Sequence, residues 1–142
     1  MESLYPIDIS REYLIGISAG GGGCYVTLAD RPQRWAAAVP IAAVCDKPSL
    51  PKIHNVPIWL IHGVDDETVP LTHSEIVFNH MQENGSNIRY TRVQNWKHGP
   101  WEPVFNDDNG FTDNYIGGDV SNKNIGLYTW LFSFARAHSP CK

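Results

Sequence analysis

Cysteines and basic clusters are scarce in this sequence, and both shortages exclude classes of protein. The three cysteines, Cys24, Cys45 and Cys141, form an odd and widely spaced set. Such a set provides neither a disulfide framework nor the Cys-x-x-Cys spacing of a metal site. The 11 lysines and arginines stand against 15 aspartates and glutamates, for a formal net charge of −4. Because no basic run is present to neutralise phosphates, we expect no nucleic-acid partner.

Long apolar runs are also absent. No stretch approaches the roughly 20 apolar residues that a membrane span requires, so we expect no membrane partner. Residues 1–6, Met-Glu-Ser-Leu-Tyr-Pro, have neither the basic start nor the apolar core of a signal peptide. Together with the unpaired cysteines, this predicts a cytoplasmic location. No metal site is expected either, because four of the six histidines show no spacing typical of metal ligands: His54, His73, His80 and His138. The other two are His62 and His98.

The composition is that of one globular domain over residues 1–142, with 42% hydrophobic residues. Apolar runs without polar alternation predict buried parallel strands at 13–17, 35–44 and 56–62. Between them we expect helices over 20–30 and from Thr72 to Asn84-Gly85, the second opened by a Thr72–Glu75 capping box.

A strand of mixed polarity at 88–93 is expected near a sheet edge. Loops are predicted over 46–55, 94–103 and 106–124, followed by a helix carrying Ile125, Tyr128, Leu131, Phe132 and Ala135. Strands alternating with helices indicate an α/β fold, a mostly parallel sheet with helices on both faces.

The first apolar run ends in Gly-Ile-Ser-Ala-Gly, residues 16–20. This Gly-x-Ser-x-Gly pattern is that of a nucleophile elbow, a sharp turn from strand to helix that exposes a serine hydroxyl. We expect Ser18 to have a strained backbone. The glycines on either side, Gly16 and Gly20, are expected where strand and helix approach too closely for a Cβ.

Polar groups follow three of the predicted strands, in the chain order serine, aspartate, histidine: Ser18, the Asp65-Asp66 pair and His98. The carboxyl ends of parallel strands meet at one edge of a sheet, so these side chains are candidates for a common site. A histidine can take the proton of a serine nucleophile, and a carboxylate can orient that histidine. Asp65 and Asp66 both remain candidates for the acid, and Asp46, after the second strand, is a third.

Five blocks of the sequence resemble the α/β-hydrolase superfamily. They are Gly-Ile-Ser-Ala-Gly-Gly, Ala-Ala-Ala-Val-Pro-Ile, Val-Pro-Ile-Trp-Leu-Ile-His-Gly-Val-Asp-Asp-Glu-Thr-Val-Pro, Lys-His-Gly-Pro-Trp-Glu-Pro and Leu-Tyr-Thr-Trp-Leu-Phe. The branch they resemble comprises predicted peptidases and phospholipase/carboxylesterase-like serine esterases. The resemblance implies Ser18 as nucleophile, His98 as base and Asp66 as acid, since the His-Gly-x-x-Asp spacing starts at His62. It also implies the Ala19 amide as an oxyanion donor and Trp101 as a wall of the substrate pocket, with no cofactor.

The chain departs from the superfamily pattern at its beginning. It starts just before the nucleophile strand, and the N-terminal strands of the family have no counterpart here. We therefore expect a partial α/β-hydrolase fold without the loop that donates the second oxyanion amide. The strand Tyr13–Ile17, central in the family, is expected to form an open apolar edge. Such an edge favours homo-oligomers.

The resemblance implies a serine hydrolase that cleaves small carboxylic esters through an acyl-enzyme. Two alternatives remain open: a serine peptidase on the same scaffold, and a truncated hydrolase without activity that serves as a binding or inert module. Three other features are interpreted as structural. We expect His62 to support the end of its strand and Cys24 to be a small buried hydrophobe. The Asp107-Asp108-Asn109-Gly110 stretch lacks the register of a calcium loop.

Overall fold

The computed structural model describes residues 4–99, 101–106, 114–117 and 125–137. Within these ranges the strands form one sheet in the order of the sequence: β1 (Tyr13–Ile17), β2 (Ala37–Ile41), β3 (Ile58–Gly63), β4 (Ile88–Val93) and β5 (Asn114–Gly117). β1 to β4 are parallel and β5 runs antiparallel to β4. The predicted mostly parallel α/β sheet is confirmed.

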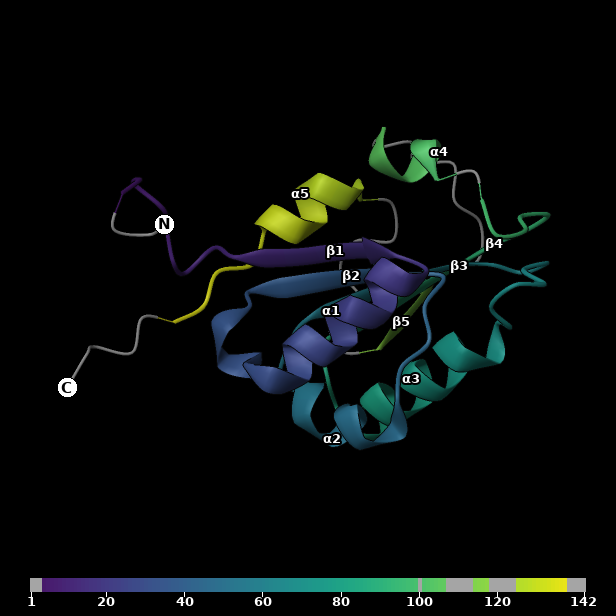
Figure 1. Cartoon of the computed structure of the whole chain (residues 1–142), viewed down its shortest axis with the longest axis horizontal. Coiled ribbons are helices and arrows are strands. Elements are labelled where there is room, and N and C mark those ends of the chain that lie inside the picture. The colour runs from purple at the N-terminus through teal and green to yellow at the C-terminus, as the bar shows by residue number, and fades with distance from the viewer. Residues whose placement is uncertain (1–3, 100, 107–113, 118–124, 138–142) are drawn as a thin grey trace.

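Helices cover both faces of the sheet (Figure 1). One face carries α1 (Ala19–Asp30), α2 (Leu50–Ile53) and α3 (Thr72–Glu83), and the other carries α4 (Glu102–Phe105) and α5 (Leu127–Phe132). β3 shows why its apolar run lacks alternation. Ile58 and Leu60 pack under the first set of helices, whereas Trp59 and Ile61 pack under the second. Both faces of the strand are thus removed from water.

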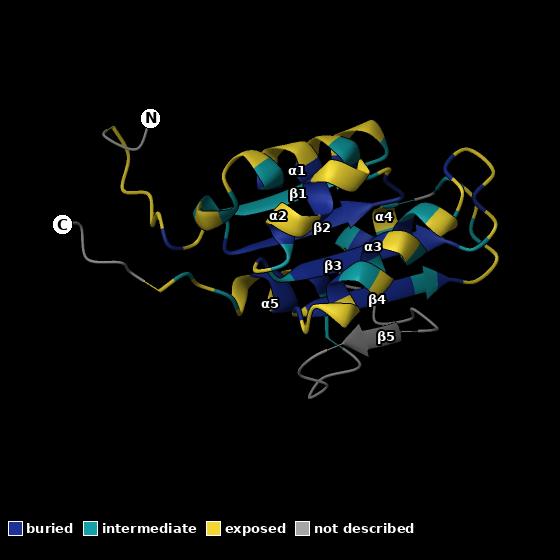
Figure 2. Ribbon diagram, turned by 90° about the horizontal axis from the view of Figure 1, so that it is seen from below, coloured by how far each residue is buried: buried dark blue, intermediate teal, exposed yellow. Residues whose placement is uncertain are grey.

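Burial is uneven across the sheet (Figure 2). Every residue of β2 and β3 is buried, whereas all five residues of β1 are only partly buried. β1 pairs with β2 on one side and has no second neighbour among the described strands. The expected edge position of Tyr13–Ile17 therefore holds in the described part of the chain.

The strand expected near a sheet edge, residues 88–93, is β4, which lies next to the outermost described strand because it pairs with both β3 and β5. Two of its polar side chains are buried against Trp59. The Arg89 guanidinium lies 4.3 Å from the centre of the Trp59 ring, and Thr91 Oγ1 accepts a hydrogen bond from Trp59 Nε1 at 2.9 Å. Polar side chains can be buried when such contacts satisfy them.

Several boundaries also differ from expectation. The segment 46–55 is not a simple loop but contains a 3-10 turn (Lys47–Ser49) and α2, while α4 and β5 interrupt the two later loops. α3 begins after Leu71 without a side-chain cap, so the capping box does not form. α5 ends at Phe132 and leaves Ala135 outside it. Among the described helices, none is long and apolar enough to cross a membrane.

Candidate active site

Ser18 occupies the single residue between β1 and α1. Its backbone has φ 53° and ψ −117°, a left-handed conformation that costs energy for a residue with a Cβ. Two hydrogen bonds hold it there. The Ser18 N–H donates to Ile41 O at 2.8 Å, and Ser18 O accepts from the N–H of Gly22 at 3.0 Å. The local fold is thus the strained strand-to-helix turn that the sequence predicts.

The glycines around the turn do not all serve the same purpose. A Cβ on Gly16 would lie 2.2 Å from the carbonyl oxygen of Gly20, so the prediction is correct there. A Cβ on Gly20 would have nothing within 4 Å, so that part was wrong. Gly21 is the second crowded position, since its Cβ would lie 2.5 Å from that of Ala43. The close approach is between α1 and the segment that follows β2.

The loop that carries His98 is held against the end of β3. A Cβ on Gly63 would lie 2.4 Å from the carbonyl oxygens of both Trp96 and Lys97, so only glycine permits this approach. The N–H of Asp65 donates to Trp96 O at 2.8 Å. These contacts join the histidine loop to the aspartate loop.

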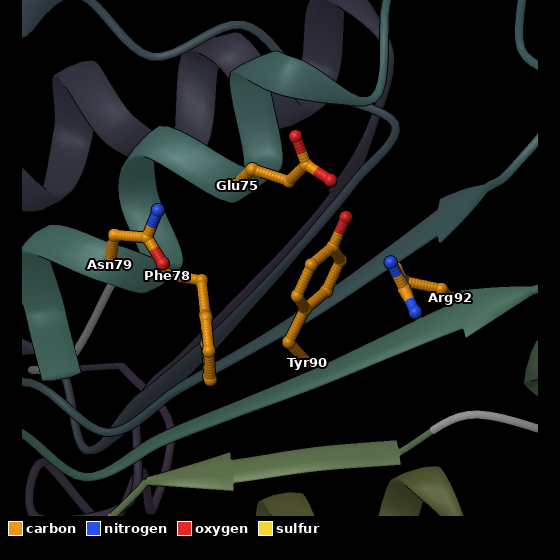
Figure 3. A pocket seen from close by; sticks show the side chains of 5 residues that line it. All are labelled: Glu75, Phe78, Asn79, Tyr90 and Arg92. Carbon is orange, nitrogen blue, oxygen red and sulfur yellow. The ribbon is translucent and has the colours of Figure 1, made fainter.

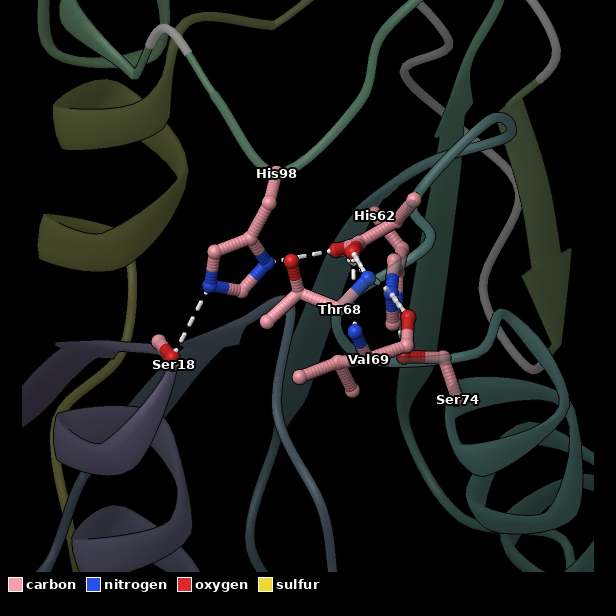
Figure 4. Close-up of polar contacts among 7 residues, drawn as sticks. Ser18, His62, Thr68, Val69, Ser74 and His98 are labelled. Atoms are coloured by element: carbon pink, nitrogen blue, oxygen red, sulfur yellow. Dashed lines mark hydrogen bonds and ion pairs between the residues drawn. The ribbon is translucent and has the colours of Figure 1, made fainter.

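The structure brings Ser18, His98 and Asp66 together from three sequence segments, and Figure 4 shows Ser18 and His98 facing each other. His98 Nε2 lies 2.9 Å from Ser18 Oγ, and His98 Nδ1 lies 2.7 Å from Asp66 Oδ2. Both distances are those of hydrogen bonds. With Nδ1 donating to the carboxylate, Nε2 of a neutral imidazole is free to accept the serine proton. The arrangement is the hydrogen-bonded chain that nucleophilic catalysis by serine requires.

The Asp66 carboxylate is buried but well supplied with donors. Its Oδ1 accepts the backbone N–H groups of Thr68 and Val69, both at 2.8 Å, while Oδ2 faces His98. Burial raises the pKa of Asp66, but the hydrogen bonds from His98, Val69 and Thr68 outweigh it, so the pKa is lowered. Asp66 is therefore ionised at neutral pH.

The structure separates the three candidate aspartates. Asp65 is exposed and Asp66 is buried against His98. Asp46 is exposed and its Oδ1 accepts the hydroxyl of Ser49 at 2.6 Å. Geometry thus favours Asp66, as the family spacing implies.

Two further predicted site residues lie beside the triad. Ala19 is exposed and is the first residue of α1, where a backbone N–H has no intrahelical acceptor and is available to an anion. The Trp101 ring stands edge-on to the His98 ring, with 6.2 Å between centroids and an angle of 89°. Trp101 therefore contacts the proposed base. Its role as a pocket wall remains a prediction.

Sequence reasoning did not identify the surroundings of His62. This imidazole is fully buried, with Nδ1 2.7 Å from Ser74 Oγ and Nε2 2.8 Å from Val69 O. Its Nε2 also lies 3.3 Å from Asp66 Oδ2 (Figure 4). The available signal was that His62 and Asp66 occur in one sequence block. Ser74, eight residues beyond Asp66, carried no such signal.

Other candidates lie elsewhere or are chemically unsuited. Cys24 is buried, and burial raises the pKa of its thiol to about 11, which disfavours the nucleophilic thiolate. Among the described residues no group of three or more His, Cys, Asp or Glu side chains could hold a metal ion. Residues 107–110 and Cys141 lie outside the described ranges.

A cavity of about 230 Å³ lies between α3 and β4 (Figure 3). It is lined by Glu75, Phe78, Asn79, Tyr90 and Arg92. None of these belongs to the hydrogen-bonded chain of Ser18, His98 and Asp66. The cavity is therefore not assigned to the reaction.

Comparison with solved structures shows what the chain is similar to. A thermostable esterase superposes with a TM-score of 0.77 and 29% identity over 96% of this chain and 34% of its own. Esterase PE8 superposes with a TM-score of 0.59 and 22% identity over 68% of this chain and 46% of its own. The Pyrococcus horikoshii acylaminoacyl peptidase superposes with a TM-score of 0.62 and 18% identity. The match covers 70% of this chain and 22% of the peptidase. No protein-family model and no curated protein matches the sequence.

These likenesses define the class. The chain has the α/β-hydrolase fold, as its sequence motifs indicated. It spans about a third of the length of the thermostable esterase.

Proposed function

We propose that this chain is a serine hydrolase that cleaves carboxylic esters through an acyl-enzyme. The observation that carries the proposal is the continuous hydrogen-bonded chain from Ser18 Oγ through His98 to Asp66 Oδ2, with Ser18 on a strained turn. The 29% identity to a thermostable esterase supports ester chemistry.

In the first half of the reaction, Ser18 Oγ attacks the acyl carbon while His98 Nε2 takes its proton. The negative charge that develops on the carbonyl oxygen is held by the N–H of Ala19. Asp66 stabilises the imidazolium that forms. The imidazolium then protonates the departing alcohol, which leaves the acyl group on Ser18.

In the second half, a water molecule attacks the acyl carbon and His98 takes its proton. Collapse of this intermediate breaks the bond to Ser18 Oγ, and the imidazolium returns a proton to the serine. The carboxylic acid departs. Apart from the substrate and this water, both halves as proposed use only groups of Ser18, Ala19, Asp66 and His98.

The proposal assigns one oxyanion donor, the Ala19 N–H. Loss of one donor from a two-donor site typically lowers turnover about 10²–10³-fold. We therefore expect the Ala19 N–H to contribute a factor of about this size to turnover.

The test is hydrolysis of p-nitrophenyl acetate together with covalent labelling by a fluorophosphonate, comparing the wild type with Ser18→Ala. We expect the wild type to label and to hydrolyse the ester, and Ser18→Ala to do neither. Absence of label on the folded wild type would overturn the enzymatic proposal and favour a binding or inert module. Equal labelling of the Ser18→Ala variant would show that another residue is the nucleophile.

A peptidase is the second candidate, favoured by the structural likeness to an acylaminoacyl peptidase. The two activities share the acyl-enzyme but differ in the leaving group. A parallel assay with an acylated amino-acid p-nitroanilide distinguishes them. We expect the ester to be cleaved at least 100-fold faster than the anilide. Comparable rates would assign the chain to the peptidases instead.

A further inference from the structure

Asp66 is held from two sides. On one side its Oδ1 accepts the N–H groups of Thr68 and Val69. On the other, Oδ2 faces the imidazole of His98 at 2.7 Å and that of His62 at 3.3 Å. His62 lies under this carboxylate with no exposed surface, and the mechanism above gives it no step.

The partners of His62 determine its tautomer. A backbone carbonyl can only accept, so the 2.8 Å contact with Val69 O requires the proton on Nε2. In a neutral ring Nδ1 then accepts the hydroxyl of Ser74 at 2.7 Å. Burial lowers the pKa of His62 and so favours the neutral ring. The Nε2–H points toward both Val69 O and Asp66 Oδ2.

Val69 connects the two contacts. Its N–H donates to Asp66 Oδ1, and its carbonyl accepts from His62 Nε2. The same residue that anchors one carboxylate oxygen is therefore itself anchored by His62. Removing the imidazole leaves the Val69 carbonyl without this donor and takes the second N–H away from Asp66 Oδ2.

We propose that His62 is a positioning residue for the Ser18–His98–Asp66 chain: its Nε2–H, oriented by Ser74, fixes the turn at residues 66–69 and the direction of Asp66 Oδ2 toward His98. This inference rests on the proposed function for its consequence on rate. Its geometric content does not depend on turnover.

Two substitutions separate positioning from packing. Glutamine places an amide nitrogen near the position of Nε2, so His62→Gln can still donate to Val69 O. Asparagine reaches only the position of Nδ1, so His62→Asn can satisfy Ser74 but not Val69 or Asp66. The matched control is His80→Gln on α3, which the mechanism does not involve.

We expect kcat for p-nitrophenyl acetate to stay within about threefold of wild type in His62→Gln and to fall about tenfold or more in His62→Asn, since a lost hydrogen bond to a charged group is worth about this much. KM should stay within about twofold, because His62 is fully buried and has no surface that a substrate could contact. His80→Gln should be unchanged. If folded His62→Asn and His62→Gln lose kcat equally, the residue is structural and the proposal is overturned.

A second readout does not require turnover. The proton on His98 Nδ1, bound to Asp66, should give a proton NMR resonance downfield of the backbone amides. We expect it in the wild type and in His62→Gln, and shifted upfield or lost in His62→Asn. An unshifted resonance in folded His62→Asn overturns the proposal. If the wild type neither labels nor hydrolyses ester, the proposed function fails, and this spectrum alone decides the role of His62.

Ser74→Ala serves where His62→Asn does not fold, since it removes one hydroxyl and leaves the ring in place. We expect the His98 resonance to shift and kcat to fall about threefold to tenfold, because Nδ1 of His62 loses the hydroxyl that orients the ring. A resonance and a kcat equal to those of the wild type would overturn the role of Ser74 in the proposal.

Discussion

At the scale of single residues, two adjacent aspartates differ completely in environment. Asp66 is buried, accepts three hydrogen bonds and faces His98, whereas Asp65 is exposed and contributes its backbone N–H to the histidine loop. The position of Asp66 in a turn closed by its own Oδ1 explains the difference. Their chemical identity makes the pair a matched test of position.

We expect Asp66→Asn to lower kcat about 10⁴-fold, because an amide in place of the carboxylate favours the wrong His98 tautomer. Asp65→Asn should stay within about twofold of wild type. Ester hydrolysis under saturating substrate measures both. Equal losses in the two variants would contradict the assignment of Asp66 as the acid.

His62 and Asp66 also make stability depend on pH. Burial lowers the pKa of His62 below its ordinary value of 6.5. As the pH falls, this side chain therefore takes up a proton at a higher pH in the unfolded chain than in the folded one. The free energy of unfolding should therefore fall as pH decreases below about 6.5. Asp66 also has a lowered pKa, so a further loss begins as pH falls toward its ordinary value of 3.8. Both groups contribute most at neutral pH and above.

Urea denaturation between pH 8 and pH 3 measures this dependence. We expect the free energy of unfolding to decrease from pH 7 to pH 5, because burial lowers the pKa of His62 in the folded chain. The decrease should be smaller in His62→Gln and retained in His80→Gln. An unfolding free energy that is flat over this interval in the wild type would contradict the expectation.

At the scale of elements, glycine is required at only some of the positions around the turn between β1 and α1. Gly16 and Gly21 lie where a Cβ would meet other atoms within 2.5 Å, whereas Gly20 and Gly23 have open space. The four consecutive glycines at the start of α1 are therefore not equivalent. Only some of them are required for the approach of the helix to the sheet.

We expect Gly16→Ala to destabilise the fold by about 3 kcal/mol, since the new Cβ meets the backbone of Gly20. Gly23→Ala should stabilise it by about 0.4–1 kcal/mol, because alanine reduces the entropy of the unfolded chain and favours the helix. Thermal or urea unfolding measures both changes. Similar effects of the two substitutions would contradict the role assigned to Gly16.

At the scale of the whole molecule, β1 leaves one edge of the described sheet open. Its side chains are only partly buried, and exposed aromatic residues of α5 lie beside it, with the Tyr13 and Phe132 rings 5.5 Å apart. An open apolar strand edge pairs readily with another strand. We propose that a second copy of the chain covers this edge.

Sedimentation velocity over a range of protein concentrations tests the association. We expect dimers or larger species whose fraction increases with concentration, and a shift toward monomer in Ile15→Lys, which places a charge on the edge strand. Val26→Lys on the exposed surface of α1 is the control for added charge. A wild type that remains monomeric at high concentration would contradict the proposal.

Local sequence patterns predicted most of the fold and the residues of the candidate site. Unalternated apolar runs placed the first three strands, because strands covered on both faces have no polar side to display. The Gly-x-Ser-x-Gly turn placed Ser18 on its strained backbone, because steric crowding there is local. The proximity of Ser18, Asp66 and His98 was predicted because each follows a strand and the carboxyl ends of parallel strands meet at one edge of a sheet.

Tertiary structure alone decided the features that depend on contacts distant in sequence. β4 lies between β3 and β5 because it pairs with both. Its polar residues Arg89 and Thr91 can be buried because both contact Trp59. The family spacing already implied Asp66, and the structure adds that its carboxylate, and not that of Asp65, faces His98. The link from Ser74 through His62 to Val69 and Asp66 was invisible in sequence, because hydrogen bonds between buried side chains are set by packing in space and not by spacing along the chain.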